Sequence, residues 1–482
     1  MRVTDSSTCP APKVTATGAS TFALTVALLA APSAARANPF DGFGAGARSQ
    51  AMAGAVGALT HDHMATFHNP AGLAHGVTEL GFGLVGSFNR TSILLSPRPA
   101  GYDPPTYAKR LNPRSDTEDP QGVIGATVGL NLKMFHDDLA LAVAFYVPFQ
   151  GFARIRTAFA DEDEQYFRNR LRFERLGDSL QGEVIAVGLG YRLLPWFSMG
   201  IGLMILPVVE SVNNVYTPNS ADPSTAKINV DIEQSARAAL TAGVLAQPLD
   251  WLRAGVAFQD EIFLGLEGYN QVQLRGDEDS EPILQDLDVV SHYSPPRLSA
   301  SVALGRTGGV IGSIEGTWHG WSNYRDARGD LAHFEDTIDW KAGVEYPVER
   351  HTFFRGGVGF DPSPVPEQTG RTNYVDNDRV ILSLGAGRDF ELWGEQLTLD
   401  VSVQLQTLLR HETRKTARSG GAYPPCAEGE TALCDEVPDL AADTPLMRAE
   451  DTKGLQTGNP GFPGFTHGGY MAVSSIDLKW RF

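Results

Sequence analysis

The sequence predicts an all-β protein: a 14-stranded antiparallel transmembrane β-barrel with an N-terminal hatch, or plug, inside its lumen. Three observations predict it. The 482-residue chain opens with an apolar leader. Stretches of period-two alternation recur after it, and the polar links between them are alternately short and long. We therefore expect a signal peptide at 1–37, the hatch at 38–77 and the barrel with long extracellular loops at 78–482.

The leader has the parts of a secretory signal. Arg2 and Lys13 precede the apolar run TFALTVALLAA at 21–31, and small residues flank the expected cleavage point after Ala37. The apolar run is too short to cross a bilayer as a helix. We expect the mature chain to begin at Asn38 and to be exported.

The end of the chain shows the alternation most clearly. A period of two means a strand with one apolar side. In an exported chain that ends on an aromatic residue, the apolar side is expected to face lipid and the charged side a wet or ligand-lined lumen. Ile476, Leu478, Trp480 and Phe482 share the apolar face, and Asp477, Lys479 and Arg481 share the other.

The same alternation predicts fourteen strands after the hatch, each long enough to cross an outer membrane when tilted. Short links, such as 194–196 and 348–350, alternate with long polar ones, such as 149–181 and 412–469. A soluble β-sandwich predicts no such alternation, whereas short periplasmic turns and long external loops produce it. The predicted strands are 78–89, 121–132, 138–148, 182–193, 197–210, 228–247, 251–274, 284–306, 309–321, 337–347, 352–361, 378–389, 395–411 and 470–482.

The composition argues against several functions. With 39 basic and 57 acidic residues, the chain has a formal net charge of -18, and nucleic acid requires a basic face. The sequence has no G-x-S-x-G elbow, so we expect no enzyme, no catalytic residue and no cofactor.

Cys426 and Cys434 lie in the last and longest expected external loop, an oxidising location, and are predicted to form a local disulfide.

Three histidines gather in the stretch HDHMATFH. His61, His63 and His68 have the close spacing that zinc sites use, but a closed site needs a fourth ligand and a second shell, and no other His/Cys cluster lies nearby in the sequence. The alternative is that they are polar side chains of a plug that packs against a polar wall. We expect this second arrangement and no metal.

Segment 38–77 has no alternation and is rich in Gly and Ala. It is too short to fold as a domain alone and too apolar to be a solvated tail. A barrel of fourteen strands has a lumen too wide for its own side chains to fill. The segment is therefore expected inside the barrel.

The hatch also carries family motifs. The run FGAGARSQAMAGAVGALTHDHMATFHNPAGLA resembles the hatch of the outer-membrane long-chain fatty-acid and hydrocarbon transporters (FadL/TodX type). Arg48, residues 51–55 and residues 69–74 match its motifs, while His61-Asp62 replaces the usual acidic pair. The stretches YVPF at 146–149, TWHGWSNY at 317–324, and FFRGGVGFDPSPVPEQTGR followed by VDNDRVILSLGAG are also similar to the family. Loop 412–469 resembles none of its segments.

The resemblance implies a passive channel in the outer membrane of a Gram-negative bacterium. Fatty acids or other hydrophobic compounds would be caught in an external groove, held in an internal apolar pocket and released sideways into the membrane. Each buried CH₂ contributes roughly 0.8 kcal/mol, so such a ligand favours an apolar pocket over a wet pore. In relatives the hatch tip faces a kinked barrel strand, which assigns a lateral-gate role to Asn69, Pro70 and Ala71.

Ligand contacts can be assigned to four residues. Relatives use the N-terminal segment in the internal pocket, which points to Phe40 and Phe43. A carboxylate head group should meet a basic side chain, and Arg154 and Arg156 are candidates. The loop 157–176 has aromatics at helical spacing and is either part of the external catch or a solvated amphipathic helix.

The expected partners follow from the same resemblance. They are a hydrophobic small molecule, outer-membrane lipid and lipopolysaccharide, and the barrel-assembly machinery that reads the terminal Phe482, with the protein a monomer. Two alternatives remain open. A general outer-membrane porin would need an open lumen, against which the apolar hatch argues. A surface adhesin built on a barrel would act through its loops, 412–469 above all.

Overall fold

The computed structural model describes residues 39–97, 117–134, 137–149, 172–173, 175, 184–206, 209–213, 230–234, 237–272, 283–325, 331–349, 351–370, 372–415, 461 and 463–482. The expected signal peptide at 1–37 and most of the long connections lie outside these residues. The same holds for Arg154, Arg156, Cys426 and Cys434, so the head-group contacts and the disulfide stay predictions.

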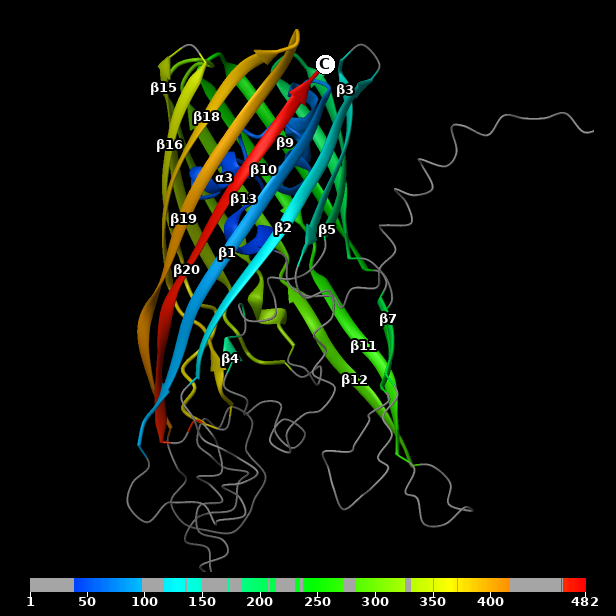
Figure 1. The fold of residues 1–482 in the computed structure, drawn as a ribbon, viewed down its shortest axis with the longest axis vertical. Coiled ribbons are helices and arrows are strands. Elements are labelled where there is room, and N and C mark those ends of the chain that lie inside the picture. The colour runs from blue at the N-terminus through cyan, green and yellow to red at the C-terminus, as the bar shows by residue number, and fades with distance from the viewer. Residues whose placement is uncertain are drawn as a thin grey trace, which may run out of the picture.

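The strands form one closed antiparallel barrel, in which β1 pairs with both β2 and β20 (Figure 1). Each of the fourteen predicted strands overlaps one barrel strand, so the predicted fold class is confirmed. The barrel strands are β1 (Glu79–Leu95), β2 (Thr117–Met134), β3 (Leu139–Pro148), β5 (Val184–Leu194), β6 (Phe197–Leu206), β9 (Arg237–Leu249), β10 (Leu252–Gln259), β13 (Arg297–Leu304), β14 (Ile311–His319), β15 (Thr337–Glu349), β16 (Thr352–Asp361), β18 (Arg379–Leu392), β19 (Glu395–Arg414) and β20 (Gly464–Arg481).

Three predicted strands, 228–247, 251–274 and 284–306, were too long. Each joins a barrel strand to a strand of a second sheet, which projects from the loop end of the barrel (Figure 1). In each case the alternation of apolar and polar residues does not show where the barrel strand ends, because a period of two does not report which neighbour a strand pairs with. Pro295 and Pro296 mark one junction. The second sheet has the order β12 (Ile283–Ser294), β11 (Ile262–Val272), β8 (Val230–Gln234) and β7 (Val209–Asn213), and β4 (Arg172–Phe173) pairs separately with β17 (Tyr374–Val375).

The connections confirm the predicted alternation where both ends are described. Short turns join β5 to β6, β9 to β10, β15 to β16 and β18 to β19 at the end of the barrel that also holds the C-terminus (Figure 1). The second sheet and the strand ends from which the long connections start lie at the opposite end (Figure 1). We refer to these as the turn end and the loop end.

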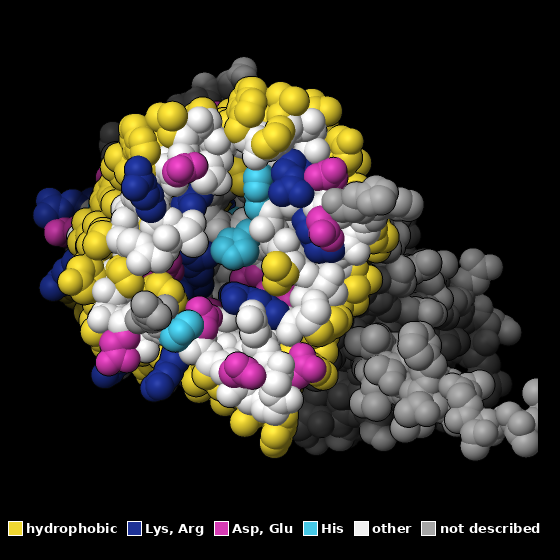
Figure 2. All heavy atoms as spheres, turned by 90° about the horizontal axis from the view of Figure 1, so that it is seen from above, with side chains coloured by type: hydrophobic (Ala, Val, Ile, Leu, Met, Phe, Trp, Pro, Cys, Tyr) yellow, Lys and Arg dark blue, Asp and Glu magenta, His cyan; other side chains and the backbone are white. Residues whose placement is uncertain are grey.

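The barrel wall is apolar outside and polar inside. Along β19, Leu399, Val401 and Val403 are exposed, while the intervening Asp400 and Ser402 are buried. Viewed along the axis, hydrophobic side chains form the rim, and charged side chains and histidines gather toward the centre (Figure 2). Outward aromatics mark the membrane boundaries: Trp196, Trp251, Trp393 and Trp480 near the turn end, and Phe88 and Tyr470 toward the loop end. Among the described residues, no helix is both long enough and apolar enough to cross a bilayer.

The apolar band predicts a depth-dependent cost of charge on the outer face. Leu384 is 72% exposed on the outer face of β18. Changing it to Arg should lower the folding stability of the protein in lipid by about 2–4 kcal/mol. Trp393→Arg at the β18–β19 turn, where the side chain is 93% exposed, should cost about 0–1 kcal/mol. Urea titration of each variant folded into lipid vesicles measures both. Equal costs would place Leu384 outside the apolar band.

Candidate functional site: the hatch in the barrel lumen

The hatch consists of short helices inside the barrel (Figure 1). Helices this short are unstable alone, so packing against the wall must hold them. Ala47, Met52, Ala55 and Ala71 are fully buried. The helices are α2 (Pro39–Phe43), α3 (Ala47–Ala51), α4 (Ala65–His68) and the 3₁₀ helix η1 (Pro70–His75).

Inward glycines let the hatch backbone touch the wall on two sides. On β16, a Cβ on Gly357 would lie 2.5 Å from the Ala53 nitrogen. On β5, a Cβ on Gly190 would lie 2.7 Å from the Pro70 carbonyl oxygen. Any side chain at these wall positions would push the hatch away, so the glycines set its fit.

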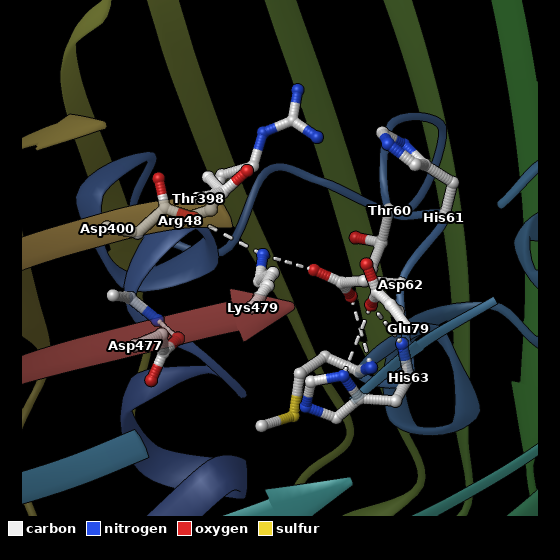
Figure 3. A network of polar contacts seen from close by, with 12 residues as sticks. Arg48, Thr60, His61, Asp62, His63, Glu79, Thr398, Asp400, Asp477 and Lys479 are labelled. Atoms are coloured by element: carbon white, nitrogen blue, oxygen red, sulfur yellow. Dashed lines mark hydrogen bonds and ion pairs between the residues drawn. The ribbon is translucent and has the colours of Figure 1, made fainter. Parts of the chain in front are cut away.

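An alternating chain of buried charges ties the hatch to the turn-end half of the wall, and we call it the ionic chain. It begins at hatch Arg48, whose Nε lies 3.0 Å from Glu345 of β15. Glu345 then pairs with Arg355 at 2.6 Å, and Arg355 pairs with Asp400 at 2.6 Å. Lys479 of β20 lies 3.3 Å from Asp400 and also pairs with hatch Asp62 (Figure 3). Both ends of the chain therefore lie on the hatch.

The ionic chain has no excess charge, because three basic side chains alternate with three acidic ones. Burial disfavours the Asp62 carboxylate, but Lys479 more than offsets this effect, so the pKa of Asp62 lies well below its usual range. Removing one partner of a buried ion pair strongly destabilises a protein, because the remaining charge stays buried without a partner. The chain thus fixes the position of the hatch.

Wall carboxylates also bind the hatch backbone. The Ala47 N–H donates to Asp477 at 2.5 Å, and the Gly57 N–H donates to Glu315 at 2.8 Å. His63 Nδ1 lies 3.3 Å from Glu79 of β1. These contacts satisfy hatch groups that water cannot reach.

The hatch tip, Asn69 to Ala71, faces β5, β6 and β9. Asn69 caps η1 by accepting from the Ala71 N–H, and its Nδ2 donates to the Gly57 and Val244 carbonyls, both at 3.1 Å. Ser198 Oγ donates to the Ala71 carbonyl at 2.9 Å. The β6–β9 ladder opposite the tip runs without a register shift, so the wall is closed there in this structure. The lateral-gate role of Asn69, Pro70 and Ala71 stays a prediction.

Phe40 and Phe43 lie in an apolar cluster toward the loop end of the lumen. The Phe40 ring lies 5.5 Å from Phe67 and 5.4 Å from Tyr146 of β3. The structure therefore brings both predicted phenylalanines into the main apolar region of the lumen. The apolar cluster comprises Phe40, Phe43, Ala45, Met64, Phe67, Val85, Ile93, Tyr146, Val184, Met204, Ala239, Ile262, Val375, Leu408, Phe465, Met471 and Val473.

The hatch histidines contact protein groups. His63 packs so closely on β1 and β2 that a side chain at Gly81 or Gly129 would overlap its ring. His68 Nε2 lies 3.1 Å from the Ala45 carbonyl. In the part of the chain that the structure describes, no three His, Cys, Asp or Glu side chains gather as a metal site would require. Burial lowers the pKa of His68 to about 4.

The loop end holds a constellation that sequence reasoning did not identify. Arg175 donates to Asp376 at 2.6 Å and to Asp361 at 3.0 Å, and its guanidinium lies 5.8 Å from the Trp321 ring. Trp321 and Tyr324 pack with other aromatics, and Tyr324 stacks on Phe334 with centroids 4.3 Å apart. The stretch TWHGWSNY and the segment around Asp361 stood out as family-like, but no signal linked them to Arg175, which lies far from both in the sequence.

The ionic chain predicts a large effect of one substitution. Lys479→Met leaves Asp62 and Asp400 buried without their shared cation, and should lower the free energy of unfolding by about 3–5 kcal/mol. Arg481→Met, on the same face but 30% exposed, should cost less than about 1 kcal/mol. Urea titration in vesicles compares the two, and equal losses would contradict a structural role for the chain.

Two hatch histidines should weaken the hatch in acid. The pKa of His68 and that of His75 are lowered by burial from 6.5 to about 4. Between these values the two histidines take up protons in the unfolded segment but not in the folded hatch, so their contribution to stability falls as pH falls from about 6.5 to about 4. Hydrogen exchange of hatch amides, corrected for intrinsic rates, compares protection at pH 7 and at pH 4.5, and His68→Gln should lose less protection between the two than the native protein does. The same change in the native protein and in His68→Gln would contradict the lowered pKa of His68.

Known proteins resemble this chain in sequence and in structure. The family described as "Outer membrane protein transport protein (OMPP1/FadL/TodX)" matches residues 25–433. A 108-residue stretch is 26% identical to Alkane uptake protein A of Marinobacter nauticus, and it covers 22% of this chain and about a quarter (24%) of that protein.

Two solved structures share the fold. A Pseudomonas aeruginosa FadL homologue superposes with a TM-score of 0.55 at 17% identity, over 94% of this chain and 99% of that one. A TodX deltaS2S3 mutant monoaromatic hydrocarbon channel gives a TM-score of 0.50 at 12% identity, over 90% and 98%. The family match covers most of the sequence and agrees with a β-barrel whose lumen holds an N-terminal hatch. The chain therefore belongs to the OMPP1/FadL/TodX family of outer-membrane transport proteins and resides in the outer membrane of a Gram-negative bacterium.

Proposed function

We propose that this protein is a passive channel that carries long-chain fatty acids or other hydrophobic compounds from outside the cell into the outer membrane. The observation that carries the proposal is the apolar cluster in the lumen, which contains Phe40 and Phe43 and lies beside a hatch that fills the bore. This apolar region, the largest of the apolar clusters among the described residues of the lumen, suits an apolar ligand, because each buried CH₂ contributes about 0.8 kcal/mol.

The proposed path has three steps. The ligand is first caught at the loop end, where the aromatic cluster of Trp321, Tyr324, Phe334 and Tyr374 lies. It then enters the apolar cluster as Phe40 and Phe43 move aside. It finally leaves sideways into the membrane. No step requires a catalyst or an energy source, only a concentration gradient, and Arg154 and Arg156 remain the proposed contacts for a carboxylate head group.

The ligand class includes fatty acids, aromatic hydrocarbons and alkanes. The match to Alkane uptake protein A supports including alkanes, although it covers a small part of both chains. A general porin is the weaker candidate, because the hatch is wedged between opposite walls. An adhesin would act through loop 412–469, most of which lies outside the described residues.

Transport can be tested in cells that lack their own transporter. Expression of this protein should speed uptake of labelled oleate, toluene or hexadecane several-fold over cells with an empty vector. Phe40→Ala combined with Phe43→Ala should change the rate for the preferred compound, because both rings occupy the apolar cluster. Equal uptake of all three compounds with and without the protein would refute the transport function.

A separate variant tests the hatch tip. Pro70→Gly combined with Ala71→Trp places a large ring at a fully buried position and should disturb the tip. Uptake should change at least several-fold relative to Val77→Trp, a matched substitution at a 48%-exposed position of the same segment. Each rate is normalised to the amount of folded protein in the outer membrane. Unchanged uptake in the tip variant would remove the gate role of Asn69, Pro70 and Ala71 and leave transport itself intact.

A further inference from the structure

The barrel ladder is interrupted at one place near the loop end. Between β19 and β20, the pair Leu408–Gly469 is followed by the pair His411–His467, so two residues of β19 face one residue of β20. This is a β-bulge, which leaves backbone groups without ladder partners. The other register shifts in the described barrel pairs lie beside the short turns.

The side chain of Asn377, from outside the two strands, bridges the interruption. Asn377 Nδ2 donates to the Leu409 carbonyl at 2.6 Å and to the His467 carbonyl at 3.3 Å. Asn377 Oδ1 lies 2.9 Å from His467 Nδ1. The Leu409 N–H donates to the Asp378 carbonyl at 2.8 Å, which continues the register of the β18–β19 ladder one step beyond the Arg379–Leu408 pair. Across the interruption, β19 and β20 are therefore bridged by the Asn377 side chain and not by a ladder pair, while β19 stays in register with the segment that precedes β18.

The interruption lies between two apolar regions. On its inner side, Leu408, Phe465 and Met471 belong to the apolar cluster. On its outer side, Leu409 is 43% exposed and Tyr470 is 39% exposed. Tyr470 pairs with Phe88 in the outward aromatics of this end, so the interruption opens at the outer boundary of the membrane.

We propose that this interruption is a side port, through which an unbranched hydrophobic chain passes between the apolar cluster and the membrane, and that Asn377 is its latch. The inference rests on the proposed transport function and names a second place of lateral passage, separate from the hatch tip. Parting two paired strands in lipid would leave a row of backbone groups unsatisfied, which is costly. At the port, the bonds that have to be exchanged are those of one amide side chain, Asn377.

A thiol block tests the port without disturbing its interior. In a background with the native cysteines changed to serine, Leu409→Cys is labelled with pyrene maleimide and compared with Leu405→Cys, 40% exposed on the same strand. Labelling should slow oleate uptake at least five-fold for Leu409→Cys and leave Leu405→Cys unchanged. Equal rates for both labelled variants would overturn the port.

A second pair of variants tests the latch. Asn377→Ala removes all the side-chain bonds across the interruption and should alter the oleate uptake rate at least three-fold. Gln368→Ala, whose side chain bonds only within the same loop, should match the native rate. If both variants transport as the native protein does, Asn377 is no latch.

The outcomes separate the port from the transport function. If the unlabelled cysteine variants take up oleate faster than empty cells do, transport stands, and the effect of the label then decides the port alone. If the native protein gives no uptake of oleate, toluene or hexadecane, the proposed function fails, and the port fails with it. If Asn377→Ala does not fold, the thiol comparison still decides.

Discussion

The structure depends on one constraint: backbone N–H and C=O groups have no partners in lipid, so every strand in the membrane must pair on both sides. The pairing of β1 with β20, from Glu79–Arg481 to Leu95–Phe465, meets this constraint by closing the sheet on itself. Closure with fourteen strands fixes a bore that the wall's own side chains cannot fill. The hatch, its small residues and its buried charges are consequences of that bore.

The filling of the bore explains two features of the sequence that are unusual in isolation. Glycines stand at inward strand positions, such as Gly190 and Gly357, because the hatch backbone lies directly against them. Charges stand at inward positions because the hatch has polar groups that need partners away from water, as in the contact of the Gly57 N–H with Glu315. Charges would also suit a wall that faced only water, but glycines at these inward positions would not be needed there, so the glycines record the presence of the hatch.

Sequence reasoning found the strands because period-two alternation is a local signal. It overextended three of them, since alternation does not tell a barrel strand from its continuation into the second sheet beyond Gln259. The hatch and the neighbourhood of Phe40 and Phe43 followed from composition and family resemblance. The ionic chain did not, because Arg48 and Glu345 lie 297 residues apart and either could pair with many other charges. The bulge at Leu409 was also invisible, since it depends on Asn377 arriving from another segment.

The arrangement separates holding the hatch from exchanging a ligand. On β20, the ionic chain uses Lys479 near the turn end, whereas Phe465 and Met471 of the apolar cluster lie toward the loop end. The hatch is fixed at Arg48, Asp62 and Asn69, so moving it as a unit would part several buried contacts at once. In the proposed side port, a ligand that reaches the apolar cluster would leave beside the interruption of the ladder while the ionic chain keeps its contacts. On this proposal, sideways release would leave the buried charges of the hatch undisturbed.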